Sequence, residues 1–217
     1  MTKVHPNLAS PSAAAGKKLV KSLSSASDLA DAAVLTVWKK SLLFNCNGFT
    51  VYDSKGNLVY RVDNYMAASG TKGEIVLMDA AGKPLHTIRR KRLSLVDNWL
   101  VYDGESSVNP RFAARKHVNI LNNKSLAHVS QGGTNGSGKN NVLYEVEGSY
   151  AQRSCGVYDE KKRMVAEIKK KEAAVGGVAF GCDVFRLVIG PEIDPSLAMA
   201  IVILLDQMFG SSKRFSG

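Results

Sequence analysis

Clusters of lysine and arginine are the residues of this sequence whose types and spacing could do chemistry. The longest cluster is residues 89–92, four adjacent cations between a β-rich segment and an apolar one. Such cations repel one another unless an anion or a carboxylate offsets them, so the cluster could bind phosphate or a lipid headgroup. A second cluster lies in a stretch, residues 106–144, that has no acidic residue. The predicted lipid- or anion-binding residues are Arg89, Arg90, Lys91, Arg92, Arg115 and Lys116.

The whole chain is basic, with 29 Lys and Arg against 19 Asp and Glu, a net charge of +10 over 217 residues. Residues 1–33 contain four Lys and two Asp, so a charge of +8 belongs to residues 34–217. A surface of this charge attracts anionic lipid, nucleic acid or an acidic protein. Two more clusters, Lys161–Arg163 and Lys169–Lys171, add to it, although the first lies in a predicted turn and is better explained as a solvated turn.

Motifs for nucleotide, metal or nucleophile chemistry are incomplete. Residues 133–140 match seven positions of a phosphate-binding loop, but Asn140 replaces the magnesium-binding Ser or Thr and a predicted strand follows instead of a helix. No histidine neighbours a cysteine or an acidic pair at metal-ligand spacing. Sequence motifs of a catalytic nucleophile are also absent, although Ser, His and Asp could converge in the fold. We therefore predict a non-enzymatic protein with no catalytic residue, no metal and no cofactor.

The termini and cysteines bear on location. Residues 1–33 are rich in Ala, Ser and Lys, which predicts a flexible tail, with an organelle transit peptide as the alternative. The tail has no apolar signal-peptide core, so secretion is not expected. Three cysteines, Cys46, Cys155 and Cys182, have no disulfide or metal spacing and are interpreted as buried thiols in a reducing compartment. We expect a cytoplasmic protein, peripheral at the plasma membrane or present in the nucleus.

From residue 34 onward, short β-rich segments alternate with Gly-containing turns. Several of these segments end in an aspartate whose carboxylate can accept backbone N–H groups of the turn that follows. These aspartates are Asp53, Asp79, Asp103 and Asp159. About twelve short strands are predicted, which indicates a closed β-barrel or a sandwich.

A helix is predicted near residues 195–209, with Asp194 as its N-cap and Pro195 at its first position. Nine consecutive apolar residues leave it no polar face, and it is too short to span a membrane. The simplest location is inside the barrel. The predicted core residues of this helix are Leu197, Ile201, Val202, Ile203, Leu204 and Leu205.

Several segments, taken in order, resemble the plant LURP-one-related family. They are Val37-Trp38-Lys39-Lys40-Ser41, the hairpin Phe49–Val62, Ile88–Leu95 with Trp99-Leu100-Val101-Tyr102, Val146–Tyr150, Arg153–Tyr158 and the terminal apolar helix. The resemblance implies a domain over residues 34–217, a twelve-stranded barrel around a hydrophobic C-terminal helix. Tubby C-terminal domains and phospholipid scramblases share that fold.

The same resemblance implies a link to plant defence and, by analogy with tubby-like transcription factors, a membrane-tethered regulator that binds phosphoinositides. Calcium-driven lipid scrambling is not supported, because Asp183, Glu192 and Asp194 are scattered among apolar residues. The leading hypothesis is a monomeric barrel that docks on anionic phospholipid. The alternatives are a protein–protein scaffold with an unknown partner, a nucleic-acid-binding basic domain, and an enzyme or fatty-ligand carrier that uses the barrel interior.

Overall fold

The computed structural model describes residues 31–40, 42, 48–65, 74–91, 97–117, 124–132, 142–172 and 180–210. Twelve β-strands and one α-helix lie in these ranges. The strands are β1 (Ala33–Trp38), β2 (Gly48–Tyr52), β3 (Leu58–Tyr65), β4 (Glu74–Asp79), β5 (Pro84–Arg90), β6 (Asn98–Asp103), β7 (Phe112–Lys116), β8 (Ser125–Gln131), β9 (Val142–Ser149), β10 (Ser154–Asp159), β11 (Met164–Lys170) and β12 (Val184–Ile189). The helix α1 is Pro195–Phe209.

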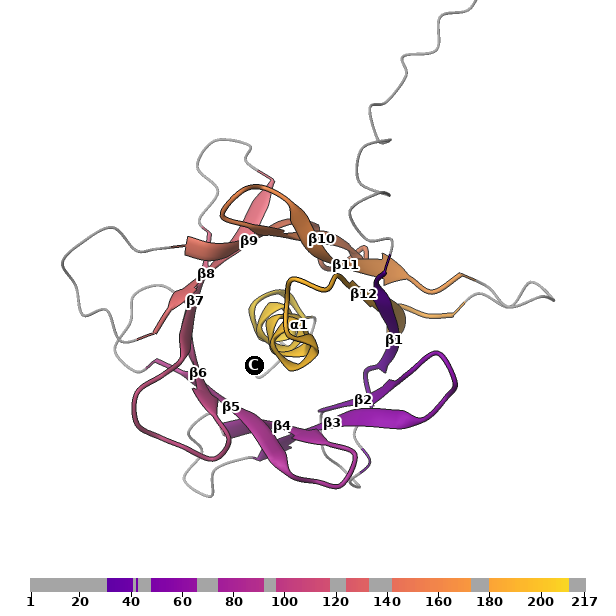
Figure 1. Ribbon diagram of the computed structural model, residues 1–217, viewed down its shortest axis with the longest axis horizontal. Helices are drawn as coiled ribbons and strands as arrows, with labels where there is room; N and C mark the ends of the chain where they lie inside the picture. The colour runs from indigo at the N-terminus through magenta and orange to yellow at the C-terminus, as the bar shows by residue number, and fades with distance from the viewer. Residues whose placement is uncertain are drawn as a thin grey trace, which may run out of the picture.

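The strands form one closed barrel. Each strand pairs antiparallel with the next strand in the sequence, and β1 pairs with β12 to complete the ring (Figure 1). Closure satisfies the backbone hydrogen bonds that an open sheet would leave at its edges. The predicted fold class is confirmed, and of the two arrangements left open, the strands form the barrel.

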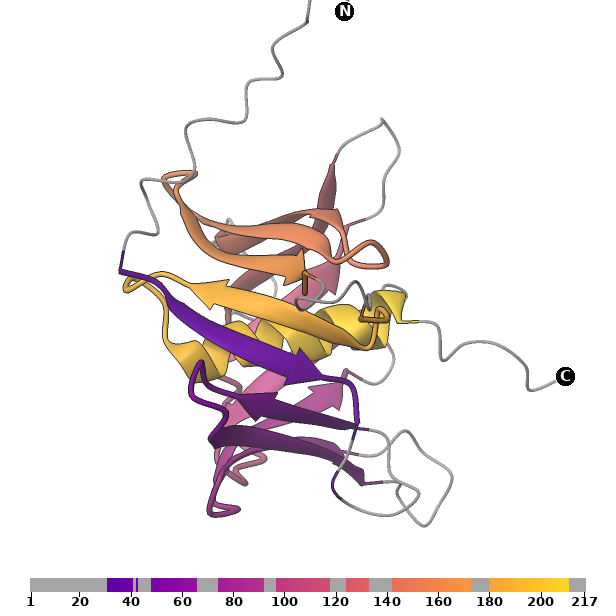
Figure 2. The same cartoon turned by 90° about the vertical axis from the view of Figure 1, so that its right-hand side faces the viewer.

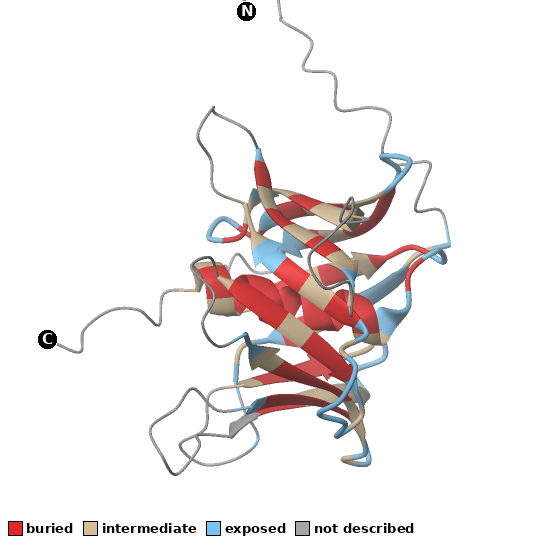
Figure 3. Cartoon of the chain, turned by 90° about the vertical axis from the view of Figure 1, so that its left-hand side faces the viewer, coloured by how far each residue is buried: buried red, intermediate tan, exposed pale blue. Residues whose placement is uncertain are grey.

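Alternation along the strands separates the barrel interior from its outer wall. On β12, Phe185, Leu187 and Ile189 are buried, whereas the residues between them are partly exposed. Figure 3 shows buried and partly exposed positions mixed along the strands that face the viewer. Successive side chains of a strand point to opposite faces, so every second residue enters the core. The inner side chains of the strands and the helix share one hydrophobic cluster.

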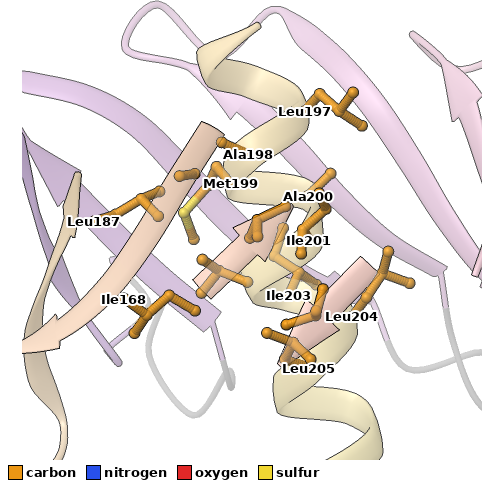
Figure 4. Packing of buried hydrophobic residues seen from close by; sticks show 14 of the residues in the cluster. Ile168, Leu187, Leu197, Ala198, Met199, Ala200, Ile201, Ile203, Leu204 and Leu205 are labelled. Atoms are coloured by element: carbon orange, nitrogen blue, oxygen red, sulfur yellow. The ribbon is translucent and has the colours of Figure 1, made fainter. Parts of the chain in front are cut away.

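Helix α1 fills the barrel interior along its length (Figures 1 and 2). Its apolar side chains pack against inward-facing strand residues such as Ile168 and Leu187 (Figure 4). All six residues that were expected to form the core of the helix are buried, and none is more than 5% exposed. Within the described residues, no helix is both long enough and apolar enough to cross a membrane.

Local capping begins the helix as predicted. The Asp194 carboxylate accepts a hydrogen bond from the Leu197 backbone N–H at 3.0 Å, and Pro195 occupies the first turn. A proline is tolerated there because the first N–H groups of a helix have no partner within it.

The aspartates at the strand ends behave as predicted in three of four cases. Asp53 Oδ1 accepts hydrogen bonds from the N–H groups of Lys55 and Asn57, each at 2.8 Å. Asp159 Oδ1 likewise accepts two backbone N–H groups, and Asp79 Oδ1 accepts that of Lys83 at 2.9 Å. Hydrogen bonds from Asn57 hold the pKa of Asp53 below its ordinary value. The prediction was wrong for Asp103: its carboxylate accepts a hydrogen bond from Arg111, because a longer connection separates β6 from β7 and brings that guanidinium alongside.

The two ends of the barrel contain different parts of the chain. The turn end comprises described residues 31–32, 53–57, 79–83, 103–111, 131–132, 159–163 and 190–194, where the short hairpin turns and the start of α1 lie. The helix-exit end, where α1 finishes, comprises described residues 39–40, 42, 63–65, 74, 89–91, 97–98, 115–117, 124, 150–153, 169–172, 180–183 and 206–210. Figure 2 shows the helix running from one end to the other.

Candidate anion-binding surface

The longest basic cluster lies where β5 reaches the helix-exit end. Arg89 Nη2 forms an ion pair with Glu74 Oε1 at 2.8 Å, and Arg90 pairs with Asp97. Lys91 is exposed, and Arg92 lies outside the described residues. Carboxylates therefore offset the charge of two of the predicted binding residues, and Lys91 is the better placed to meet a ligand.

The second cluster lies nearby, at the end of β7. Arg115 is exposed and lies opposite Asn98, the first residue of β6. The Asn98 carbonyl accepts a hydrogen bond from the Lys91 backbone N–H, so Lys91 and Arg115 lie on either side of the start of β6. Lys116 has a different role: its Nζ lies 3.5 Å from the Met208 carbonyl and 4.6 Å from the centre of the Phe209 ring. A cation there is favoured by the helix dipole and stabilises the end of α1.

The helix-exit end has an excess of cations. Its described residues include twelve Lys and Arg against six Asp and Glu, whereas those of the turn end include six against nine. The positive charge of the described residues at the two ends is therefore concentrated at the helix-exit end. Among these cations, Arg153 is buried between the rings of Tyr150 and Phe185, at 4.1 and 4.3 Å, and is not available to a ligand.

Exposed apolar side chains accompany these cations. Trp38 is 39% exposed, Leu42 54% and Phe180 41%, and all three lie at or next to the helix-exit end. Lys40 lies 5.0 Å from the Trp38 ring centre, and Lys171 lies 5.0 Å from that of Phe180. Cations beside exposed aromatic rings can bind an anionic surface and insert an apolar group at the same time.

In the turn cluster Lys161–Arg163, two of the three cations pair with carboxylates. Lys162 pairs with Glu145, which raises the pKa of the lysine, and Arg163 Nη2 pairs with Asp159 at 2.7 Å. The interpretation of this cluster as a solvated turn is confirmed.

A buried polar cluster near the end of α1 was not predicted from the sequence. Asp206 is 5% exposed and accepts hydrogen bonds from Lys39 Nζ at 2.9 Å and from the Tyr150 hydroxyl at 3.2 Å. Burial and the nearby Asp206 carboxylate raise the pKa of Tyr150, so this tyrosine stays a neutral donor. The one signal in the sequence was that Asp206 directly follows nine consecutive apolar residues. Its contacts with Lys39 and Tyr150 attach the last turn of the helix to the barrel.

Serine, histidine and aspartate do converge at the start of the helix. His86 Nε2 lies 2.8 Å from Ser196 Oγ, and His86 Nδ1 lies 3.5 Å from Asp103 Oδ1. Burial lowers the pKa of His86. However, Ser196 Oγ donates to the Asp194 carboxylate, and a hydroxyl has only one proton to donate. The contact between His86 and Ser196 therefore links the first turn of α1 to β5.

The remaining predictions are tested only in part. Cys155 is buried, which raises its pKa to about 11, but Cys182 is exposed and the prediction was wrong for it. Its carbonyl accepts Arg153 Nε at 2.8 Å, so the backbone is held while the thiol faces solvent. Cys46, the phosphate-loop match and residues 1–30 of the predicted tail lie outside the described residues. Among the described residues, no group of three His, Cys, Asp or Glu could hold a metal.

Comparison with known proteins places this chain among relatives of similar length. The model of the LURP-one-related family matches residues 33–206. Protein LURP-one-related 8 of Arabidopsis thaliana is 55% identical over 215 residues, 98% of this chain and 100% of the relative. Protein LURP-one-related 17 of the same plant is 47% identical over 188 residues, 81% of this chain and 82% of the relative.

A solved structure supports the fold alone. The crystal structure of another Arabidopsis thaliana protein aligns with a TM-score of 0.58 at 23% identity, covering 81% of this chain and 90% of that one. The sequence matches are what establish kinship: taken with the barrel and its central helix, they show that this chain belongs to the LURP-one-related family.

Proposed function

We propose that this protein is a non-enzymatic regulator that docks on anionic phospholipid, phosphoinositides included, through the helix-exit end of its barrel. The observation that carries the proposal is the twofold excess of cations at that end, beside exposed Trp38, Leu42 and Phe180. Each cation close to an anionic leaflet contributes about 1 kcal/mol, and tryptophan favours the membrane interface. Together these contacts suit reversible, peripheral binding.

Within the described part of the chain, the cations that carry the docking are those that no carboxylate offsets. Arg89 and Arg90 pair with Glu74 and Asp97, so their replacement would break two ion pairs at the barrel rim. Lys91 and Arg115 are exposed and lie on either side of Asn98, the first residue of β6. We therefore assign the main electrostatic contribution to Lys91 and Arg115.

The regulatory part of the proposal rests on the family resemblance. Release from a membrane would let such a barrel act elsewhere in the cell, as proposed for tubby-like regulators, and plant defence is the process in which we place it. A protein scaffold and a nucleic-acid-binding domain are the competing functions.

Vesicle sedimentation tests the proposal. The protein should sediment with phosphatidylcholine vesicles containing a phosphoinositide, and much less with phosphatidylcholine alone. Lys91→Gln with Arg115→Gln should weaken this binding, whereas the control Lys83→Gln with Lys161→Gln, two exposed cations of the turn end, should not. Melting curves verify that each variant folds.

Tryptophan fluorescence gives a second readout. Trp38 is 39% exposed and Trp99 only 3%, so insertion of Trp38 should shift the emission to the blue, and Trp38→Phe should remove the shift. The proposal fails if the wild type ignores anionic vesicles, or if the folded Lys91 and Arg115 variant binds them equally well. Binding to DNA but not to vesicles would favour the nucleic-acid alternative.

A further inference from the structure

A groove of about 550 Å³ runs along the outer wall of the barrel, where the first and last strands meet. It is lined by Val34, Thr36, Tyr52, Asp53, Ser54, Gly56, Lys171 and Arg186. Its volume lies in the range of sites that hold a small molecule. The groove crosses the seam that closes the barrel, so no short segment of sequence contains it.

Strand register assembles the polar side of the groove. Arg186 on β12 sits opposite Thr36 on β1, and Thr36 sits opposite Tyr52 on β2. All three alternate with inward-facing residues and lie on the outer face. Lys171 follows β11, and its Nζ lies 3.5 Å from Thr36 Oγ1. One guanidinium, one ammonium and two hydroxyls therefore face the same space.

No described carboxylate offsets the charge of the two cations of the groove. Among the described residues, no carboxylate lies within 4.0 Å of Arg186 or Lys171. The one lining carboxylate, Asp53, accepts hydrogen bonds from its own turn through both of its oxygens. By contrast, Lys169, which sits opposite Arg186 on β11, pairs with Glu167 at 2.8 Å.

We infer that this groove binds a phosphomonoester carried on a small polyol, the chemistry of a phosphorylated inositol headgroup. A phosphomonoester carries a charge of about −1.5 to −2 near neutral pH and has three acceptor oxygens, which matches two cations and two hydroxyl donors better than a carboxylate does. Arg186 supplies a planar fork of donors, and Lys171 a point charge. Val34, 39% exposed, borders the groove and offers an apolar contact beside the phosphate.

This inference deepens the proposed function, because it names a ligand class and a site. It rests on the proposed function in one respect, namely that the headgroup belongs to a membrane lipid. The ligand could also be a free inositol phosphate. Soluble inositol trisphosphate and phosphoinositide vesicles are therefore separate arms of the test.

Titration calorimetry with inositol trisphosphate is the decisive measurement. Arg186→Gln and Lys171→Gln should each weaken binding about tenfold or more, because each removes charge-assisted hydrogen bonds. Lys169→Gln is the matched control, with the same change of charge two residues before Lys171, and should weaken binding less than about twofold, because Lys169 already pairs with Glu167. Arg186→Lys keeps the charge but loses the planar fork of donors, so its affinity for inositol trisphosphate should lie between those of the wild type and Arg186→Gln. If Arg186→Gln does not fold, Arg186→Lys replaces it in the test.

Three outcomes would overturn the site: no binding of inositol trisphosphate by the wild type, equal loss in Lys169→Gln and Lys171→Gln, or no loss in the folded Arg186 variants. Equal loss would mean a diffuse positive field in place of a built groove. If vesicles bind but groove variants leave trisphosphate binding unchanged, the site is wrong and membrane docking stands. If trisphosphate binds in the groove and vesicles do not bind, the site stands with a free ligand and membrane docking fails.

Discussion

The two ends of the barrel are built from the same strands but use their charges differently. At the turn end, Asp53, Asp79 and Asp159 accept hydrogen bonds from residues two to four positions further along the chain. At the helix-exit end, Asp206 is buried against Lys39, 167 residues earlier. Carboxylates outnumber cations at the first end, whereas cations outnumber carboxylates two to one at the second.

This difference shows why net charge alone says little about a binding surface. Local turns retain their acidic residues because each carboxylate satisfies several backbone N–H groups. Of the six carboxylates among the described residues of the helix-exit end, Asp63 and Asp206 are buried, each under 6% exposed, so they offset little of the surface charge. The surface that remains there is basic and partly apolar.

The largest expected effect tests whether one helix supports both ends. Ile203→Asp places a carboxylate at a position that is 0% exposed within the apolar cluster, which costs several kcal/mol of a total stability of about 5–15. We expect loss of the cooperative melting transition in circular dichroism. Ile203→Val, the control, should cost only about 1 kcal/mol. An unchanged melting temperature for Ile203→Asp would mean that the ends do not depend on the helix.

The next effect contrasts a buried with an exposed carboxylate at the helix-exit end. Asp206→Asn keeps the shape but removes the charge that Lys39 and Tyr150 contact, and should cost about 2 kcal/mol in urea unfolding. Glu74→Gln removes the ion pair of Arg89 at a half-exposed site and should cost less than about 1 kcal/mol. Equal costs would contradict the assignment of Asp206 as the anchor of the last helical turn.

A smaller effect concerns the cap at the turn end. Asp194→Ala removes the acceptor for the Leu197 N–H and should lower the free energy of unfolding by about 1 kcal/mol. Glu192→Ala, at an exposed position two residues earlier, should change it by less than about 0.5 kcal/mol. If the two variants were equally stable, the cap would not hold the start of the helix.

The smallest effect is a pH dependence at the same place. His86 is buried beside Asp103, Arg111, Asp194 and Ser196, and burial lowers its pKa. The unfolded chain therefore takes up a proton below pH 6.5 that the folded chain resists, so stability is full above that pH and falls as the pH drops below it. The loss from this group at pH 6 should be less than about 1 kcal/mol, measured by urea unfolding at pH 6 and pH 7.5.

His86→Gln supplies the comparison for that experiment. It should remove the part of the pH dependence due to His86 while keeping an amide near Ser196. A wild type and variant that lose the same stability between pH 7.5 and pH 6 would show that His86 titrates alike in the folded and unfolded chains.

Local patterns made most of the fold predictable. Hairpin signals around Asp53, Asp79 and Asp159, and an apolar helix that begins at Pro195, depend on neighbours within a few residues, and all are confirmed. The exception, Asp103, failed because its partner Arg111 lies beyond the turn. The candidate surface was predicted less well, since Arg89 and Arg90 proved to be offset by Glu74 and Asp97.

The sequence by itself determined the strands, the central helix, the membership of a family and the excess of positive charge. Only the tertiary structure decided which of the described cations have no carboxylate partner. Arg186 and Thr36 become neighbours because β12 pairs with β1 across 150 residues, and Lys39 meets Asp206 because the last helix returns through the barrel. Strand register and barrel closure set these contacts, and neither is written in the local pattern of a single strand.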